Sequence, residues 1–497
     1  MSQFLPYRNV LNLLLLFVLL LSFSSAVWAE SSDPVQPTKP SSLPSFQPEL
    51  IGALCLIRSD DRLLLIREYI THKLSLPGGT IKKGEDPRVT AQRETWEESG
   101  IAVDVLDELG RTESAIIYNC QVQSEIIAYN NSNRDQRLEL PIFNAPHFGV
   151  EVLSAQLVLP KNVNVSQYRY AYQWPLVEHL FESANNQSIR HINHLIDLAP
   201  SYQRVQLSWL NSLQTAVKHG PSWLQSMIML GGEALNLVMQ PLILLILLPV
   251  FIWQWGRIFT AELVFACVTT SLFVLVTKQG FSLPLPHAYL PSINFTQQSG
   301  YSFPDIYLAN WSCISLIVMS QIERYYRSRF LIIALVSTAI LVFYQFISGA
   351  AFLTDMLVGS LIGMLSGWHF VRHYLSNSRD QLAIFIGVKA WSIVLTVAAL
   401  LTITWPHPSF IGWTTLSLGM LAYALINRQC CSITPMSLLE LFVSVAVVIG
   451  VLSGFYHWLP SISHETSYVL LSKVSVMVLI VALPALVMFG FRRKKTL

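Results

Sequence analysis

Two hydrophobic patterns divide the chain. From about residue 49 to 185, short apolar runs alternate with polar stretches, and the runs IGALCLI, RLLLIRE, AIIYNCQVQ and GVEVLSAQLVL predict strands. Two stretches, 85–98 and WPLVEHLFESA, are predicted to be helical. Because strands and helices alternate, these residues predict an α/β or α+β domain.

From about residue 236 the pattern changes to long apolar segments. Each is close to the roughly 20 residues that cross a bilayer. They lie at 236–256, 260–277, 306–320, 331–348, 354–371, 382–404, 411–427, 437–457 and 467–490. The chain is therefore predicted to be multidomain, with a soluble domain followed by an all-α polytopic membrane domain of about nine spans.

Basic residues fall in every second loop between these segments. They are Arg257, Arg324, Arg327, Arg329, Arg372, Arg379, Arg428 and the terminal RRKK. The intervening loops 279–305, 405–410 and 458–466 contain no Lys or Arg. Because basic loops stay in the cytoplasm, this alternation predicts a cytoplasmic C-terminus and an exported location for residues 30–235.

The N-terminal residues 1–29 contain a long apolar run that ends in small residues before Ala29. This pattern predicts either a cleaved signal peptide or a first membrane span, and in both cases the residues after Ala29 would be exported. The Pro- and Ser-rich residues 30–48 predict a linker.

Residues 186–235 are predicted to be a juxtamembrane helical segment. Within 203–219, five apolar side chains recur at helical spacing: Val205, Trp209, Leu210, Leu213 and Val217. Such a stripe is compatible with a helix on the membrane surface and equally with a helix packed on its own domain.

Composition supports a membrane protein and offers no reason to expect nucleic acid as a partner. Hydrophobic residues make up 52% of the 497, the mean hydropathy is +0.46, and the net charge is only +2. Two cysteines, Cys55 and Cys120, fall in the soluble part. They could pair in an oxidising compartment, but we favour two buried thiols.

The stretch from residue 75 to 101, SLPGGTIKKGEDPRVTAQRETWEESGI, concentrates carboxylates in a chain with few charges. Glu94, Glu97 and Glu98 stand at i, i+3 and i+4, so a helix places them on one face. Oxygen ligands suit Mg²⁺ or Mn²⁺, and Arg93 could pair with Glu97 or reach a phosphate. The alternative is a solvated charged face.

The spacing Gly79, five residues, Glu85, seven residues, then Arg93-Glu94-x-x-Glu97-Glu98 resembles the signature of the Nudix hydrolases. The one departure is Thr95, where the family usually has an aliphatic residue. The resemblance covers about residues 49–185. It implies an α/β/α sandwich that hydrolyses a diphosphate linked to another moiety, with Mg²⁺ or Mn²⁺ as cofactor.

The resemblance also implies roles for these residues. Glu94, Glu97, Glu98 and the carbonyl of Gly79 would hold the metal, and Glu85 and Arg93 would orient the helix. Glu97 or Glu98 is the first expectation for the general base. Two glutamates on later segments, Glu125 and Glu151, are the alternatives.

Three stretches between residues 236 and 376 resemble the motifs of the type 2 phosphatidic acid phosphatases, which are K-x6-R-P, P-S-G-H and S-R-x5-H-x3-D. The first and last positions, Lys278 and Asp355, are retained. The other key positions are replaced: Leu285 and Gln345 stand at arginines, and Tyr307 and Ala351 at the two histidines. Since Ala351 is no nucleophile and Tyr307 a poor acid, the resemblance implies a membrane domain without that family's catalysis.

Residues 377–497 would add four further spans without a recognisable motif. The leading hypothesis is a multi-pass membrane protein whose Nudix domain lies on the non-cytoplasmic side, in the periplasm if the membrane is a bacterial inner membrane. Its substrate would be a nucleoside diphosphate-linked or lipid-linked diphosphate, and membrane lipids would be its partners. The alternatives are a lipid phosphatase with an accessory Nudix domain, or a non-enzymatic scaffold or transporter.

Overall fold

The structure of the protein is a computed structural model that describes residues 50–130, 137–238, 251, 254–255, 257–291, 300–376 and 387–427. The predicted signal peptide or span at 1–29 and the linker at 30–48 lie outside this part of the chain, as do the two last predicted spans.

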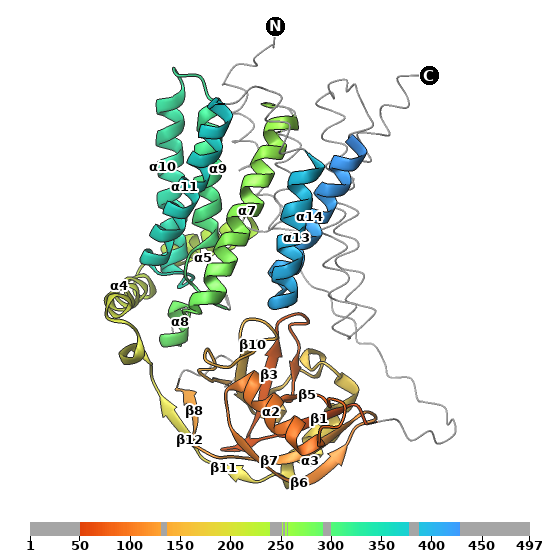
Figure 1. Cartoon of the computed structure of the whole chain (residues 1–497). Helices are drawn as coiled ribbons and strands as arrows, with labels where there is room; N and C mark the ends of the chain where they lie inside the picture. The colour runs from red at the N-terminus through yellow and green to blue at the C-terminus, as the bar shows by residue number, and fades with distance from the viewer. Residues whose placement is uncertain are drawn as a thin grey trace, which may run out of the picture. The chain divides into compact units, whose positions relative to one another are not determined.

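The N-terminal part is built on two mixed sheets and a small strand pair (Figure 1). The first sheet has the order β5-β1-β7-β6, with β1 parallel to β7 and the other pairs antiparallel. Its strands are β1 (Gly52–Leu56), β5 (Gly78–Thr80), β6 (Val103–Arg111) and β7 (Ala115–Val122).

The second sheet has the order β11-β2-β3-β10-β9, and β4 pairs with β3. Its strands are β2 (Arg58–Ser59), β3 (Arg62–Glu68), β4 (Leu74–Ser75), β9 (Leu138–Glu139), β10 (Val152–Val158) and β11 (Asn186–Gln187). The separate parallel pair consists of β8 (Ile126–Tyr129) and β12 (Ile189–Ile192).

One helix covers each face of the first sheet. Successive residues of a strand point to opposite faces, and β1 shows the consequence. Cys55 lies in the same buried cluster as Ala91 of helix α2 (Pro87–Ser99), whereas Leu56 lies with Val177 of helix α3 (Trp174–Ser183). The domain is therefore a mixed α/β structure with helices on both sides of a sheet, as the sequence predicts.

The four predicted strands correspond to β1, β3, β7 and β10, and the two predicted helices correspond to α2 and α3. Strand β6, the longest strand of the first sheet, is not among the strands predicted from the sequence. Its pairing with β7 shifts register between Val105 and Glu108 and again between Glu108 and Gly110. These irregularities interrupt the two-residue alternation that marks a strand in a sequence.

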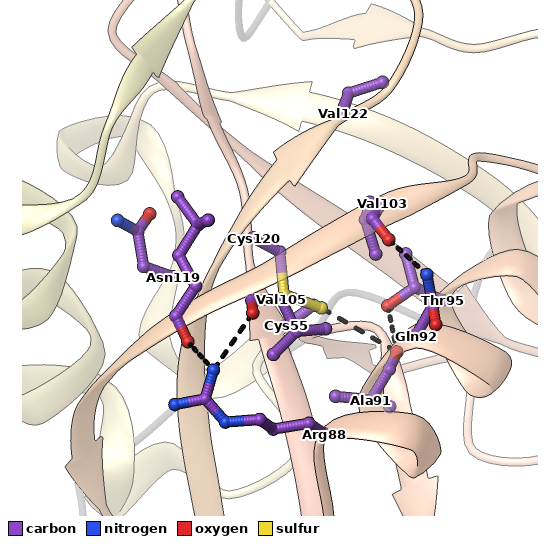
Figure 2. The surroundings of a disulfide bond; sticks show 12 residues. Cys55, Arg88, Ala91, Gln92, Thr95, Val103, Val105, Asn119, Cys120 and Val122 are labelled. Atoms are coloured by element: carbon purple, nitrogen blue, oxygen red, sulfur yellow. Dashed lines mark hydrogen bonds between the residues drawn. A yellow bond between two sulfur atoms is a disulfide. The ribbon is translucent and has the colours of Figure 1, made fainter.

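The favoured interpretation of Cys55 and Cys120 as free thiols is wrong, because the two form a disulfide (Figure 2). Their Cα atoms lie 5.5 Å apart although 65 residues separate them in the chain. The parallel pairing of β1 with β7 brings them together, and this pairing cannot be read from the sequence. The sulfur of Cys55 lies 3.7 Å from the carbonyl oxygen of Ala91, so the bond sits directly beneath α2.

Most of the described residues from Ser201 onward are helical (Figure 1). The helices are α4 (Ser201–Lys218), α5 (Ser222–Val238), α7 (Arg257–Phe281), α8 (Pro286–Tyr289), α9 (Ile306–Gln321), α10 (Arg327–Ile347), α11 (Leu353–Ser376), α13 (Val388–Thr404) and α14 (Pro408–Asn427). Glycines of α11 allow its backbone to approach α9. A Cβ atom at Gly359 would lie 2.2 Å from the carbonyl oxygen of Asp305, and one at Gly363 would lie 2.0 Å from that of Ala309. Such small-residue contacts are frequent between membrane helices.

Among the described residues, two helices are long and apolar enough to cross a membrane, not about nine. They are Phe259–Phe281, which is mostly buried, and Arg327–Ile347, which is mostly exposed. The apolar helices Ile306–Gln321 and Val388–Thr404 are shorter, with 16 and 17 residues, or about 24–26 Å of helix against about 30 Å of hydrocarbon. Three predicted segments, 236–256, 437–457 and 467–490, fall largely or wholly outside the described residues.

Part of the predicted apolar stripe on helix α4 is buried against other helices, and part of it is exposed. Leu210 is buried in a cluster with residues of α9, α10 and α11, among them Leu308 and Leu341, whereas Val205 and Trp209 are about half exposed. The amide of Gln214 donates a 2.6 Å hydrogen bond to the carbonyl oxygen of Ile347. This helix therefore packs on the other helices and still leaves apolar side chains uncovered.

Candidate active site on helix α2

Helix α2 carries local signals for both of its ends. Asp86 is the N-cap, and its side chain accepts a 2.8 Å hydrogen bond from the backbone N–H of Arg88. Pro87 occupies the first helical position, where a missing N–H costs nothing. At the other end Gly100 adopts φ 71° and donates to the carbonyl oxygen of Trp96. The helix begins two residues later than the predicted residue 85, so Glu85 lies in the preceding loop.

The glycine pair brings the backbone of β5 close to the helix. Gly78 has φ 148°, and a Cβ there would lie 2.4 Å from the carbonyl oxygen of Ala53. A Cβ at Gly79 would lie 2.5 Å from the carboxylate carbon of Glu94. Only glycine at position 79 therefore leaves room for the Glu94 carboxylate beside the strand backbone.

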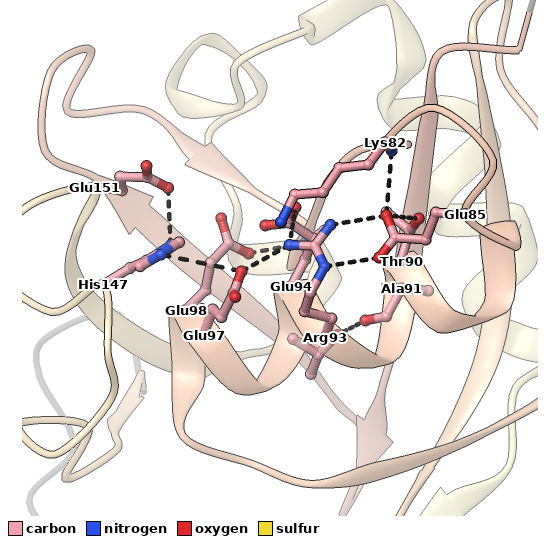
Figure 3. A network of polar contacts seen from close by, with 12 residues as sticks. Lys82, Glu85, Thr90, Ala91, Arg93, Glu94, Glu97, Glu98, His147 and Glu151 are labelled. Carbon is pink, nitrogen blue, oxygen red and sulfur yellow. Dashed lines mark hydrogen bonds and ion pairs between the residues drawn. The ribbon is translucent and has the colours of Figure 1, made fainter.

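Arg93 holds the carboxylates of this face together (Figure 3). Its Nη1 lies 2.7 Å from Glu94 Oε1 and 2.8 Å from Glu97 Oε2, and its Nε lies 2.9 Å from Glu85 Oε1. The cation between these anions offsets the repulsion that like charges at helical spacing would otherwise create. Hydrogen bonds lower the pKa of Glu85 to about 2, and the bond from Arg93 has a larger effect than the bond from Thr90.

Glu98 points to a different neighbour. The residue is 8% exposed, and its carboxylate accepts a 2.8 Å hydrogen bond from the backbone N–H of Gly78. Burial raises its pKa well above the usual value, against the opposing effect of that hydrogen bond. Glu98 thus joins α2 to the glycine turn.

His147, which belongs to none of the sequence motifs, completes the group. One ligand atom each from Glu94, Glu97 and His147 lies within 4.8 Å of the other two. His147 belongs to the loop before β10, and its Nδ1 lies 3.0 Å from Glu151 Oε2 (Figure 3). That contact raises the pKa of His147 and lowers the pKa of Glu151. No sequence spacing relates this loop to α2, so no local pattern could have revealed the histidine.

These residues fit a divalent cation. Two carboxylates and an imidazole converge, and the absent Cβ at Gly79 leaves its backbone open beside Glu94. Of the two alternative bases, Glu151 lies beside this group through His147, whereas Glu125 is exposed and faces Arg190 at 3.5 Å. Thr95, the one departure from the Nudix signature, is buried and satisfies its hydroxyl by donating to the carbonyl oxygen of Ala91 at 2.7 Å.

Comparison with known proteins agrees with this geometry. The family model described as "NUDIX domain" matches residues 48–171. These residues are a Nudix domain. The predicted boundaries of 49–185 begin at nearly the same position, and the matched range contains the whole of α2 together with His147 and Glu151.

Two curated relatives match parts of this chain. A "MutT-like protein" of Streptomyces ambofaciens is 40% identical over 74 residues, which are 15% of this chain and 46% of the relative. An "RNA pyrophosphohydrolase" of Roseobacter denitrificans is 41% identical over 44 residues, which are 9% of this chain and 28% of the relative. The chain thus spans less than half the length of the curated relatives it matches.

Solved structures of similar proteins include a UDP-X diphosphatase and an ADP-ribose pyrophosphatase from Streptococcus suis. The UDP-X diphosphatase is 18% identical, and the match covers 31% of this chain and 71% of that chain. The ADP-ribose pyrophosphatase is 14% identical, and the match covers 28% of this chain and 96% of that chain. Both TM-scores are 0.20, so the assignment of the Nudix domain rests on the sequence matches.

A second polar cluster lies among the helices, where the sequence resembles the lipid phosphatases. Lys278 interacts electrostatically with Asp305 and Asp355, and Gln345 lies beside Asp305. Asp305 caps α9 by accepting from the backbone N–H of Leu308, and Asp355 lies in the first turn of α11. The structure therefore brings together the retained Lys278 and Asp355 and the replaced position 345.

The positions that would have carried the lipid-phosphatase chemistry are filled by groups that cannot perform it. Leu285 and Ala351 are almost fully buried, and Ala351 belongs to an apolar cluster around Phe352. Tyr307 lies in the first turn of α9, next to Asp305.

Proposed function

We propose that the Nudix domain hydrolyses the phosphoric anhydride of a diphosphate-containing small molecule or lipid, with Mg²⁺ or Mn²⁺ as cofactor. The observation that carries this proposal is the convergence of Glu94 and Glu97 beside the backbone of Gly79. A relative that matches 44 residues of this chain carries the name "RNA pyrophosphohydrolase", which describes cleavage of the same type of bond.

The proposed roles are based on the contacts. Glu94 and Glu97 would hold the cation, with Glu98 and the Gly79 carbonyl nearby. A divalent cation bound there would neutralise phosphate oxygens and make a bound water a stronger nucleophile. Arg93 and Glu85 keep the carboxylates in one orientation. Glu97 and Glu98 are the first candidates for the general base.

We also propose that the helical part lies in a membrane. Helix α10 has 21 residues, a length of about 31 Å, and its large apolar side chains Ile332, Leu335, Val336 and Ile340 are more than half exposed. Water would not favour so continuous an apolar surface, whereas lipid would.

The Nudix domain is proposed to lie on the non-cytoplasmic side of that membrane. The disulfide between Cys55 and Cys120 supports this location, because such bonds persist in oxidising compartments. The alternation of basic and neutral loops predicts the same side. An exported site would encounter lipid-linked diphosphates and nucleotide conjugates more readily than free cytosolic nucleotides.

The test is hydrolysis by the full chain in detergent micelles. ADP-ribose, UDP-sugars and polyprenyl diphosphate are supplied with Mg²⁺, with Mn²⁺, or with chelator, and the products are separated by chromatography. We expect hydrolysis of at least one substrate that stops in chelator and falls at least about 100-fold in Glu97→Gln. Glu113→Gln, which changes an exposed glutamate of the same domain, is the matched control. Full activity in chelator or in Glu97→Gln contradicts the proposal.

A further inference from the structure

The loop that carries His147 is fastened to the end of helix α2. The last carbonyl groups of a helix have no partner within the helix. One of them, the carbonyl oxygen of Glu97, accepts a 2.8 Å hydrogen bond from the backbone N–H of His147. The same residue thus offers its carbonyl to the loop and its carboxylate to the candidate metal site, so the histidine is placed there by the backbone.

The loop is also closed on itself around His147. The carbonyl oxygen of His147 accepts from the backbone N–H groups of Glu151 at 3.0 Å and Val152 at 3.2 Å, where β10 begins. The imidazole is therefore held between α2 and β10 rather than on a free surface loop, and its side chain is 31% exposed.

The two ring nitrogens face different carboxylates (Figure 3). Nδ1 lies 3.0 Å from Glu151 Oε2, and Nε2 lies 4.0 Å from Glu97 Oε2. A carboxylate 3.0 Å from Nδ1 favours a proton on that nitrogen, and this leaves the lone pair of Nε2 free for a metal, as in many histidine-metal sites. Ligands about 2.1 Å from an octahedral ion lie roughly 3.0 Å apart when adjacent and roughly 4.2 Å apart when opposite, so the 4.0 Å separation is short enough for one ion to reach both atoms.

We propose that Nε2 of His147 is a ligand of the divalent cation in the Nudix domain, with Glu151 as its positioning residue, and that the site therefore prefers a first-row transition ion to Mg²⁺. This inference rests on the proposed function, because it concerns the same cation. Mg²⁺ takes oxygen ligands almost exclusively, whereas transition ions also accept imidazole. A site formed by Glu94 and Glu97 alone would not distinguish transition ions from Mg²⁺.

The opposing interpretation is that His147 and Glu151 form a simple ion pair that closes the loop. An ion pair would leave the cation with oxygen ligands only, and removing the imidazole would then not alter the ratio of transition-ion to Mg²⁺ affinity. The two interpretations thus differ in a measurable property that does not depend on turnover.

The experiment uses the full chain in detergent micelles without substrate, and Mn²⁺ is the probe. Electron paramagnetic resonance counts bound Mn²⁺, and pulsed measurements detect coupling to a directly bonded ¹⁴N. We expect ¹⁴N coupling in the unchanged protein, its replacement by ¹⁵N coupling after labelling with ¹⁵N-histidine, and its loss in His147→Gln. Labelling leaves the chain unchanged, so this part of the test does not depend on how the variant folds.

Affinities supply the second readout. The affinity of His147→Gln for Mn²⁺ should be about 10- to 100-fold lower than that of the unchanged protein. Its affinity for Mg²⁺, measured by competition with Mn²⁺, should fall no more than about 3-fold. Glu151→Gln should weaken Mn²⁺ by a smaller factor, because it acts through the imidazole. His191→Gln, at an exposed histidine of β12, is the matched control and should bind as the unchanged protein does.

Bound Mn²⁺ without histidine nitrogen coupling would overturn this inference and leave the proposed hydrolase intact. If His147→Gln lowers the affinities for Mn²⁺ and for Mg²⁺ by the same factor, the inferred preference for a transition ion is wrong. If the unchanged protein binds neither ion and hydrolyses no diphosphate, the proposed function itself fails, and that outcome is distinct from the other two.

Discussion

Arg93 donates two hydrogen bonds to Glu85, from Nε at 2.9 Å and from Nη2 at 3.1 Å. This pair joins the loop before α2 to the middle of the helix, while the third nitrogen of the same guanidinium reaches Glu94 and Glu97. A single planar cation thus sets the geometry of the carboxylate face from one side, because a guanidinium offers its donors in a fixed arrangement.

The pairing predicts a pH-dependent contribution of Glu85 to stability. Its pKa is lowered from 4.5 to about 2, so the folded state favours the ionised carboxylate. The stabilisation is then complete above about pH 4.5 and is lost as the pH falls towards 2. We expect the thermal midpoint of Glu85→Gln to lie below that of the unchanged protein at pH 6, and the difference to disappear near pH 2. The thermal midpoints of both proteins are measured at each pH by intrinsic fluorescence during heating.

Glu113→Gln is the control for this comparison, since that exposed residue should show no comparable difference at any pH. A midpoint difference in Glu85→Gln that is unchanged from pH 6 to pH 2 would mean that the Glu85–Arg93 pair does not contribute in this way.

The disulfide predicts a stability that depends on redox conditions. Closing a loop of 65 residues restricts the unfolded chain, a contribution of about 4 kcal/mol in the loop-entropy model. Unfolding of the Nudix domain should therefore begin at lower denaturant in dithiothreitol or in the double variant Cys55→Ser/Cys120→Ser. Limited proteolysis of full-length protein across a urea series measures this shift.

Dithiothreitol should not destabilise the double variant further, and this is the internal control for effects on other groups. Equal resistance of oxidised and reduced protein would show that Cys55 and Cys120 are not paired in solution.

The proposed topology predicts opposite signals from two fusions. A reporter that is active only outside the cytoplasm should give signal when fused at about residue 200 and none when fused after Leu497. The reverse result would place the Nudix domain in the cytoplasm, and the substrates would then have to be sought among cytosolic diphosphates.

The helical part should not release phosphate from lipids. Alanine at position 351 and tyrosine at position 307 leave neither the nucleophile nor the acid that a phospho-enzyme would need. We expect the Glu98→Gln protein to release no phosphate from phosphatidic acid, phosphatidylglycerophosphate or polyprenyl diphosphate. Phosphate release that disappears in Lys278→Ala would establish a working site around Lys278, Asp305 and Asp355.

Features that depend on neighbouring residues could be predicted from the amino-acid sequence. The common face of Glu94 and Glu97 and the salt bridge between Arg93 and Glu97 both depend on spacings of a few residues, because a helix converts such spacings directly into geometry. The strands β1, β3, β7 and β10 are likewise visible as local apolar runs.

Features that depend on long-range pairing arise only when the chain folds. The parallel register of β1 with β7 joins Cys55 to Cys120, and the hydrogen bond from His147 to the end of α2 adds an imidazole to the carboxylates. The convergence of Lys278, Asp305 and Asp355 likewise requires three helices to pack at their ends. Residues far apart in the chain have no fixed geometry until strands pair and helices pack, and that is why no local pattern contains these contacts.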